Sequence, residues 1–226
     1  MGDHDPRKVV AIPAVNRREL SSTSLAKTSK WPRTTRRQQR IAEVIARRQP
    51  DLTLVLENVH DPHNVSSVLR TCDAVGVLGV HLIYSVEEPP SGPFARTTSA
   101  SAAKWIETTR HTSVEGCYRS LRANGFTILG TAFEEGAHDL YDVDLCRPTA
   151  LVFGNEMRGL SEEAIAQADG HVVLPMLGMV QSLNISVACA VALYEVMRQR
   201  RQAGVYQTPK IPEADRGRLV EDWLKR

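Results

Sequence analysis

Short apolar runs alternate with helix-like segments along most of this chain, and this alternation restricts the fold more than any other feature of the sequence. The runs are LTLVLEN, GVHLIY, FTILGTA, TALVFG and HVVLP, at residues 52–58, 79–84, 126–132, 149–154 and 171–175. Strands that are apolar on both faces are typical of a parallel sheet buried between two layers. The alternation therefore predicts an α/β fold in which helices flank a parallel sheet.

The segments between these runs carry helix signals. Helices are predicted over 35–48, 63–76, 113–125, 161–169, from 181 to about 200, and over 212–225. Gly76 and Gly125 suit helix C-termini, and Ser161 precedes two acids, which suits an N-terminus. Ligands of such sheets bind beyond the carboxyl ends of the strands. This rule indicates the loops after Asn58, Thr131, Phe153 and Leu174.

The first polar segment at a strand end is ENVHDPHNVSSVLRTCDAVG, which contains Asn64 and Arg70. Arg70 stands in an otherwise apolar stretch, and arginine is rarely buried without a partner. A functional pair is one interpretation. The other is an N-terminal cap and a surface arginine.

Two more polar segments follow later strands. In LVFGNEMRGLSEEA, Gly154 and Gly159 bracket a turn that carries Glu156, although an ordinary strand-to-helix turn explains it equally well. In LPMLGMVQSLNISVA, Gln181 to Asn184 open an apolar helix, and Ser and Asn are good N-caps without any ligand. Neither segment is GxGxxG or a P-loop, so dinucleotide and ATP chemistry lack their residues.

Basic charge is concentrated at both ends of the chain. Residues 1–50 carry 12 Lys and Arg against 4 Asp and Glu, residues 197–226 carry 8 against 4, and residues 51–196 carry 8 against 18. Phosphate neutralisation dominates affinity for nucleic acid, so the basic flanks favour a nucleic-acid partner. The alternative is solvated tails and a solvated helix face.

Several classes of protein are disfavoured. No run of about 18 apolar residues predicts a membrane span, and the N-terminus lacks the features of a signal or transit peptide, so we expect a cytoplasmic protein. The four cysteines show no CxxC pairing and are predicted to be small buried hydrophobes in a reducing compartment rather than zinc ligands. HExxH and GxSxG motifs are absent, and no visible motif requires a metal.

Taken in order, HNVSSVLRTCDAVG, LVFGNEMRGLS and LPMLGMVQSLNISVA resemble the three motifs of the SPOUT superfamily of S-adenosylmethionine-dependent RNA methyltransferases. Within it, the chain is most similar to the TrmH-type tRNA guanosine 2′-O-methyltransferases, from about Arg36 to the C-terminus. The resemblance implies a parallel sheet flanked by helices, a deep C-terminal trefoil knot and a homodimer. It divides the chain into a basic, disordered extension (1–34), a methyltransferase domain with an N-terminal basic helix (35–201) and a C-terminal RNA-binding tail (202–226).

The resemblance also implies site residues. Those that match the catalytic set are Arg70, Asn64, Glu156, Ser182 and Asn184. Those that match the S-adenosylmethionine pocket are Thr131, Gly154, Leu174, Met176, Ser182 and Leu183. Basic residues expected to bind RNA are Arg36, Arg37, Arg40, Arg47, Arg48, Arg198, Arg200 and Arg201.

The implied reaction moves a methyl group to the ribose 2′-hydroxyl of the D-loop guanosine in tRNA. Arginine is the proposed base in this family, but a guanidinium stays protonated, so binding the RNA phosphate and stabilising the alkoxide is the other role considered. In either role, the resemblance implies that Asn64 and Glu156 orient the guanidinium of Arg70. Three alternative functions are methylation of ribosomal RNA or another tRNA site, RNA binding without catalysis, and a purely structural α/β domain with basic tails.

Overall fold

The computed structural model describes residues 33–86 and 104–226. The chain divides into two units, 1–37 and 38–226. Of the first unit only residues 33–37 are described, as the start of helix α1 (Arg33–Ala46). The predicted disordered extension therefore lies almost wholly outside the described residues.

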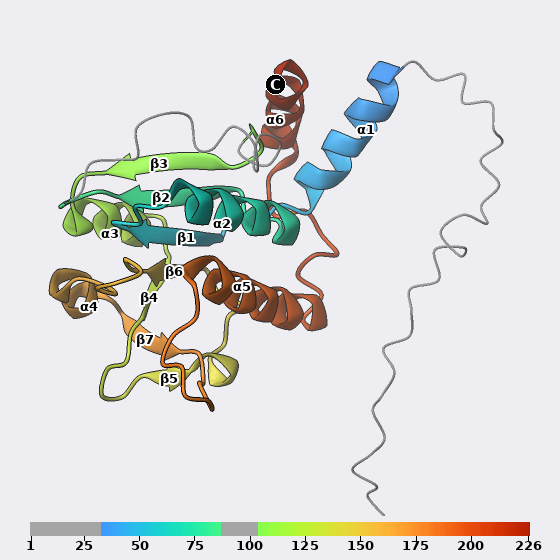
Figure 1. Ribbon diagram of the computed structural model, residues 1–226. Helices are drawn as coiled ribbons and strands as arrows, with labels where there is room; N and C mark the ends of the chain where they lie inside the picture. Colours follow the sequence, from blue (N-terminus) through green and yellow to red (C-terminus); the bar gives the residue numbers. More distant parts are fainter. Residues whose placement is uncertain (1–32, 87–103) are drawn as a thin grey trace, which may run out of the picture. The chain divides into compact units, whose positions relative to one another are not determined.

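A parallel sheet forms the centre of the second unit (Figure 1). The described strands run in the order β3-β2-β1-β6-β4-β7-β5, and every pair is parallel. Their bounds are β1 Leu52–Glu57, β2 Gly79–Ile83, β3 Glu107–His111, β4 Thr127–Thr131, β5 His138–Asp139, β6 Thr149–Phe153 and β7 Gly170–Val173. The predicted parallel α/β sheet is confirmed, and each of the five apolar runs overlaps a strand.

Helices cover both faces of this sheet. One layer holds α2 (Pro62–Val75) and α5 (Ile185–Gln202), and the other holds α3 (Val114–Ala123) and α4 (Glu162–Gln167). Successive residues of a strand point to opposite faces. Leu54 and Leu56 therefore pack in the first layer and Val55 in the second, and all three are buried.

A third, smaller cluster joins α1 to the C-terminal end of the chain. Ile41 and Ile45 of α1 are buried against Ile211 and against Trp223 of α6 (Glu213–Lys225). A short 3-10 helix, η2 (Leu140–Asp142), follows β5. Among the described residues, none of the helices combines the length and the apolar character that crossing a bilayer requires.

Candidate active site

The turn after β6 is held rigidly at the carboxyl edge of the sheet. Asn155 and Gly159 exchange two backbone hydrogen bonds of 2.9 and 2.8 Å, which close a loop around Glu156, Met157 and Arg158. The side-chain oxygen of Asn155 accepts from the backbone N–H groups of Met157 and Arg158. Hydrogen bonds within the loop therefore hold the backbone that carries Glu156 in place.

The same turn is tied to the end of β1. The Asn155 amide donates to the backbone oxygen of Asn58 at 2.8 Å, and Asn58 has a left-handed backbone with φ 51°. Beside it, the buried carboxylate of Glu57 accepts from the N–H and the hydroxyl of Ser161 at 2.9 and 2.5 Å. Ser161 in turn caps α4 as predicted, by accepting from the Ala164 N–H. Sequence reasoning missed Glu57, Asn58 and Asn155, whose polar side chains at strand ends were the available signal.

Three predicted catalytic residues from the three motifs meet in one hydrogen-bonded chain. Asn64, in the first turn of α2, donates through Nδ2 to Oε1 of Glu156 at 2.8 Å. Asn184 donates through Nδ2 to Oδ1 of Asn64 at 3.2 Å. Asn184 also caps α5 by accepting from the Ser186 N–H at 2.9 Å, so α5 begins at Ile185 rather than at Gln181. The Asn184 side chain thus both caps α5 and contacts Asn64 of the first motif.

Arg70 lies on the same helix as Asn64 but is not joined to this network. Its side chain is exposed, and among the described residues it forms no hydrogen bond or ion pair. The expectation that Asn64 and Glu156 orient its guanidinium is not met in this structure, because their facing groups bond to each other instead. The exposed guanidinium of Arg70 is therefore available to bind a ligand from solution.

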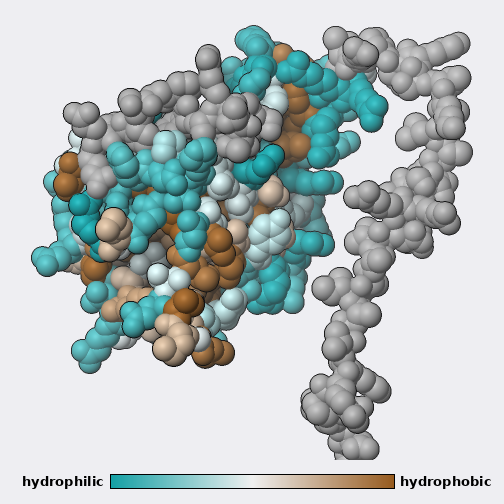
Figure 2. Space-filling view, viewed as in Figure 1, coloured by the Kyte–Doolittle hydropathy of each residue, from teal (hydrophilic) through white to brown (hydrophobic). Residues whose placement is uncertain are grey.

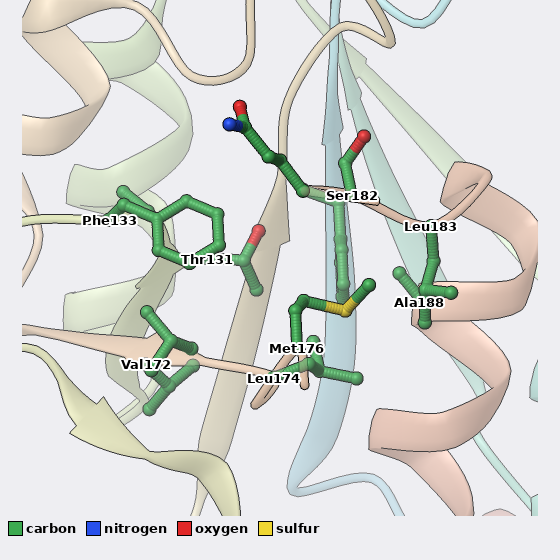
Figure 3. A pocket seen from close by; sticks show the side chains of 12 residues that line it. Thr131, Phe133, Val172, Leu174, Met176, Ser182, Leu183 and Ala188 are labelled. Carbon is green, nitrogen blue, oxygen red and sulfur yellow. The ribbon is translucent and has the colours of Figure 1, made fainter. Parts of the chain in front are cut away.

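A pocket opens between the ends of β4 and β7 and the segment before α5, and Figure 3 shows the side chains that converge on it. This Ser182 pocket holds about 520 Å³ of free space, counting its open mouth. Its lining residues are Thr131, Ala132, Phe133, Phe153, Val172, Val173, Leu174, Met176, Gln181, Ser182, Leu183 and Ala188. The set contains five of the six predicted cofactor residues. Of the others, Gln181 was noted only as part of a polar helix start, and the rest were missed because they lie in or beside apolar strand and helix segments.

Gly154 is the predicted cofactor residue that does not line the pocket. A Cβ at this position would lie 2.1 Å from the carbonyl carbon of Gly159, far inside contact distance. The requirement for glycine therefore comes from the closed turn around Glu156 and not from a cofactor wall.

Some of the predicted RNA-binding arginines surround an open groove at the carboxyl end of α2. Arg40, Arg47 and Arg201 line it together with Tyr206, and the free space is about 1050 Å³ including the open side. Arg198 is also exposed, but its guanidinium is held by Glu195 at 2.7 Å. Arg36 and Arg37 are exposed and belong to the first unit.

Two predicted RNA-binding residues, Arg48 and Arg200, are wrong, because both are fully buried. Arg48 donates to the Val77 carbonyl at 2.8 Å, pairs with Asp73 and lies 5.0 Å from the ring centre of Trp223. Arg200 pairs with Asp51 at 2.7 Å and donates to three backbone carbonyl groups. Both guanidinium groups bind the protein's own interior and cannot reach a phosphate.

Comparison with known proteins shows the family to which the chain belongs. Residues 51–194 match the SpoU rRNA Methylase family, and the chain belongs to that family. It is similar to a Thermus thermophilus protein named tRNA (guanosine(18)-2'-O)-methyltransferase, with 49% identity over 195 residues that cover 86% of this chain and 98% of the relative. The predicted resemblance to TrmH-type enzymes is thereby confirmed.

Solved structures agree with this assignment. The TrmH/SpoU tRNA modifying enzyme of A. aeolicus superposes with a TM-score of 0.79 at 34% identity, over 85% of this chain and 96% of that one. The SpoU methyltransferase AviRb from Streptomyces viridochromogenes, solved in complex with AdoMet, gives a TM-score of 0.60 at 31% identity, over 69% and 62% of the two chains.

Proposed function

We propose that this protein is an enzyme that methylates the ribose 2′-hydroxyl of the D-loop guanosine of tRNA, with S-adenosylmethionine as methyl donor. The observation that carries the proposal is the junction of Asn64, Glu156 and Asn184, which brings the three motifs together at the carboxyl edge of the sheet. The tRNA substrate is supported by the 49% identity to a tRNA guanosine methyltransferase over most of both chains. A tRNA substrate is also the basis for expecting the enzyme in the cytoplasm.

The Ser182 pocket suits the proposed methyl donor. Phe133, Val172 and Met176 provide apolar walls for an adenine ring and a thioether chain. Gln181 and Ser182 add polar groups that can orient the amino-acid end of the donor. Such a combination of apolar walls and few polar groups is typical of small-molecule sites.

In this reaction S-adenosylmethionine would supply the methyl carbon. The ribose 2′-oxygen would form a bond to that carbon as the carbon–sulfur bond breaks, the remaining thioether, S-adenosylhomocysteine, would leave, and the hydroxyl proton would pass to the solvent. Alignment of the two reactants accounts for a large part of the acceleration in such transfers. The rigid turn around Glu156 and the capped start of α5 are the parts of this chain that would hold the ribose and the donor in place.

Arg70 is proposed to bind the RNA phosphate beside the reacting ribose and to stabilise negative charge that develops on the 2′-oxygen. Its exposed side chain, without a protein partner among the described residues, is available for both contacts. Arginine remains protonated at neutral pH, which favours this electrostatic role over that of a general base.

We further propose the trefoil knot and the homodimer implied by the resemblance. The insertion of β6 between β1 and β4 supports a threaded C-terminal half. Exposed apolar residues support a dimer: Leu177, Met179 and Val180 precede α5, and Val187 and Tyr194 lie one heptad apart on it. Figure 2 shows hydrophobic surface around this part of the molecule.

The proposed RNA surface consists of the exposed arginines at both ends of the methyltransferase domain. Arg40, Arg47 and Arg201 share a groove, which supports a common polyanionic ligand. The domain division at residues 34 and 201 remains a proposal. Trp223 of α6 is buried against α1, which indicates that part of the C-terminal tail has a packing role.

The experiment that tests the proposed function is transfer of labelled methyl from S-adenosylmethionine to an unmodified tRNA transcript, followed by nuclease mapping. Label on the 2′-oxygen of the D-loop guanosine is the expected result. Label on ribosomal RNA but not on tRNA would replace the substrate and keep the reaction. Absence of transfer to either RNA would overturn the proposal.

A further inference from the structure

A cluster of three metal-ligating side chains lies in the α3 layer, apart from the motifs that form the methyltransferase site. His81 of β2, His111 at the end of β3 and Cys117 of α3 place one ligand atom each within 4.8 Å of one another. Among the residues that the structure describes, this is the one such group of three. The sequence did not suggest it, because the three residues are not adjacent and form no CxxC or HxxxH spacing.

The topology of the sheet edge brings these residues together. In the parallel pairing of β2 with β3, His81 stands opposite Thr109, and His111 opposite Ile83. His81 and Ile83 therefore point to the same face, and so does His111. Ile83 and Cys117 belong to the same buried cluster, so α3 covers that face and places the thiol beside the two rings.

The imidazole rings of His81 and His111 lie with one nitrogen of each close to the other. Nδ1 of His81 lies 2.9 Å from Nε2 of His111, and the ring centres are 5.1 Å apart. One of these nitrogens must accept, so at least one imidazole is neutral and directs a lone pair toward its neighbour. Two imidazole nitrogens on one tetrahedral zinc ion, at about 2.0–2.1 Å each, lie about 3.3 Å apart, so a small separation of the rings would admit an ion.

We propose that His81, His111 and Cys117 form a binding site for a single zinc ion, with a water molecule as the fourth ligand. Two imidazoles and a thiolate suit Zn²⁺ and other borderline or soft cations, whereas Mg²⁺ and Ca²⁺ prefer oxygen ligands. Cys117 is fully buried and His81 and His111 are partly buried, so an ion here would be largely enclosed.

Access to the cluster is available from one side. His81 also lines an open groove together with Thr109 and Ser120, with about 780 Å³ of free space counting the open side. We expect an ion and a water molecule to enter along this groove, from the His81 side of the cluster. When the sulfur of Cys117 binds the ion, its thiol proton passes to the solvent, so metal binding releases one proton.

A zinc ion at this site would stabilise the edge of the sheet. Among the described strands β3 lies at the edge of the sheet, and its first four residues are exposed. The ion would fasten β3 to β2 and α3. We expect zinc to raise the thermal stability of the protein without being required for methyl transfer.

The test is a titration of the full-length, metal-free protein with Co²⁺, which replaces zinc and is coloured. We expect one Co²⁺ per chain, tetrahedral d–d absorption, and an intense thiolate-to-cobalt charge-transfer band. Cys117→Ser should abolish the charge-transfer band, and His111→Gln should weaken binding at least about 10-fold. Cys146→Ser is the matched control and should leave both unchanged, because Cys146 is outside the cluster.

Absence of stoichiometric binding would overturn the proposal, as would a band that persists in Cys117→Ser or is lost in Cys146→Ser. Cys117 is fully buried, and its substitution can unfold the chain. In that case His111→Gln decides, because this side chain is only partly buried. Wild-type affinity and an unchanged spectrum in folded His111→Gln would also overturn the site.

Discussion

Single side chains at this site act through a few specific contacts, and Arg70 is a predicted catalytic residue that the contacts among Asn64, Glu156 and Asn184 do not include. Its position in an apolar stretch left open either a partnered functional arginine or a surface arginine, and the structure shows the side chain exposed on α2. Asn64 and Glu156, its expected partners, bond to each other at 2.8 Å. An exposed cation on the helix that also carries Asn64 is consistent with a group that binds a phosphate of the substrate.

Replacing Arg70 by Ala should reduce the rate of methyl transfer by about 100-fold or more, because a charge that stabilises the transition state is lost. Affinity for tRNA should change far less, because many basic residues share the phosphate contacts. Single-turnover kinetics and filter binding would separate the two quantities. Arg119→Ala, in an exposed pair on α3, is the control and should affect neither. Equal losses of rate and affinity would make Arg70 a general RNA contact.

Replacing Gly154 by Ala should destabilise the fold, because the added methyl group would overlap the Gly159 carbonyl. We expect a loss of about 1–3 kcal/mol in the free energy of unfolding, measured by urea denaturation. Gly178→Ala is the matched control, since a Cβ there meets nothing within 4 Å. Similar stability of the two variants would contradict the assigned role of the turn.

At the scale of elements, ion pairs join the start of β1 to α5 and to the segment that follows α5. Asp51, just before β1, binds Arg200 of α5 at 2.7 Å and also pairs with Lys210. Burial alone would raise the pKa of Asp51, but hydrogen bonds and charges from Lys210 and Arg200 hold it below its usual value. The carboxylate form is therefore stabilised in the folded protein.

Asp51→Asn should lower the free energy of unfolding by about 3 kcal/mol at neutral pH, because it leaves a buried guanidinium without its counter-charge. Since the folded pKa lies below the unfolded one, this stabilisation is present above the unfolded pKa and is lost as the pH falls through the folded pKa. The stability difference between wild type and variant should therefore shrink in acid. Denaturation across a pH series measures it, with Asp144→Asn in an exposed pair as control. A pH-independent difference would argue against the ion pair.

The elements that the sequence predicted are those with a strong periodic signal. The five apolar runs, the helix ending at Gly76 and the helix capped by Ser161 are found as expected. β3 was missed because ETTRH is polar and mostly exposed at the sheet edge, and β5 because it has two residues. The burial of Arg48 and Arg200 was also invisible, because both occur in basic segments and only tertiary packing distinguishes them from exposed neighbours.

At the scale of the whole molecule, the exposed apolar residues of α5 bear on assembly. Val187 and Tyr194 are 47% and 51% exposed, although the rest of the helix supplies much of the core. Exposed apolar area of this kind usually marks an interaction surface. We therefore expect the proposed dimer to bury these two side chains.

The double variant Val187→Glu/Tyr194→Glu should convert a dimer to a monomer, because it places charges in an apolar contact. Light scattering after size-exclusion chromatography measures the mass, and circular dichroism checks the fold. Met157→Glu is the control, as an exposed apolar residue on a different element. A wild-type monomer, or a double variant that remains dimeric, would contradict the proposed interface.

We propose that the three motifs, joined through Asn64, Glu156 and Asn184, direct methyl transfer to one ribose hydroxyl of tRNA. The most direct measurement compares two tRNAs that differ only in the D-loop guanosine, one with ribose and one with 2′-deoxyribose at that nucleotide. Both should bind with similar affinity, and only the ribose form should accept a methyl group from S-adenosylmethionine. Equal methylation of the two tRNAs would contradict the proposed reaction, because the methyl group would then reside on another atom or another nucleotide.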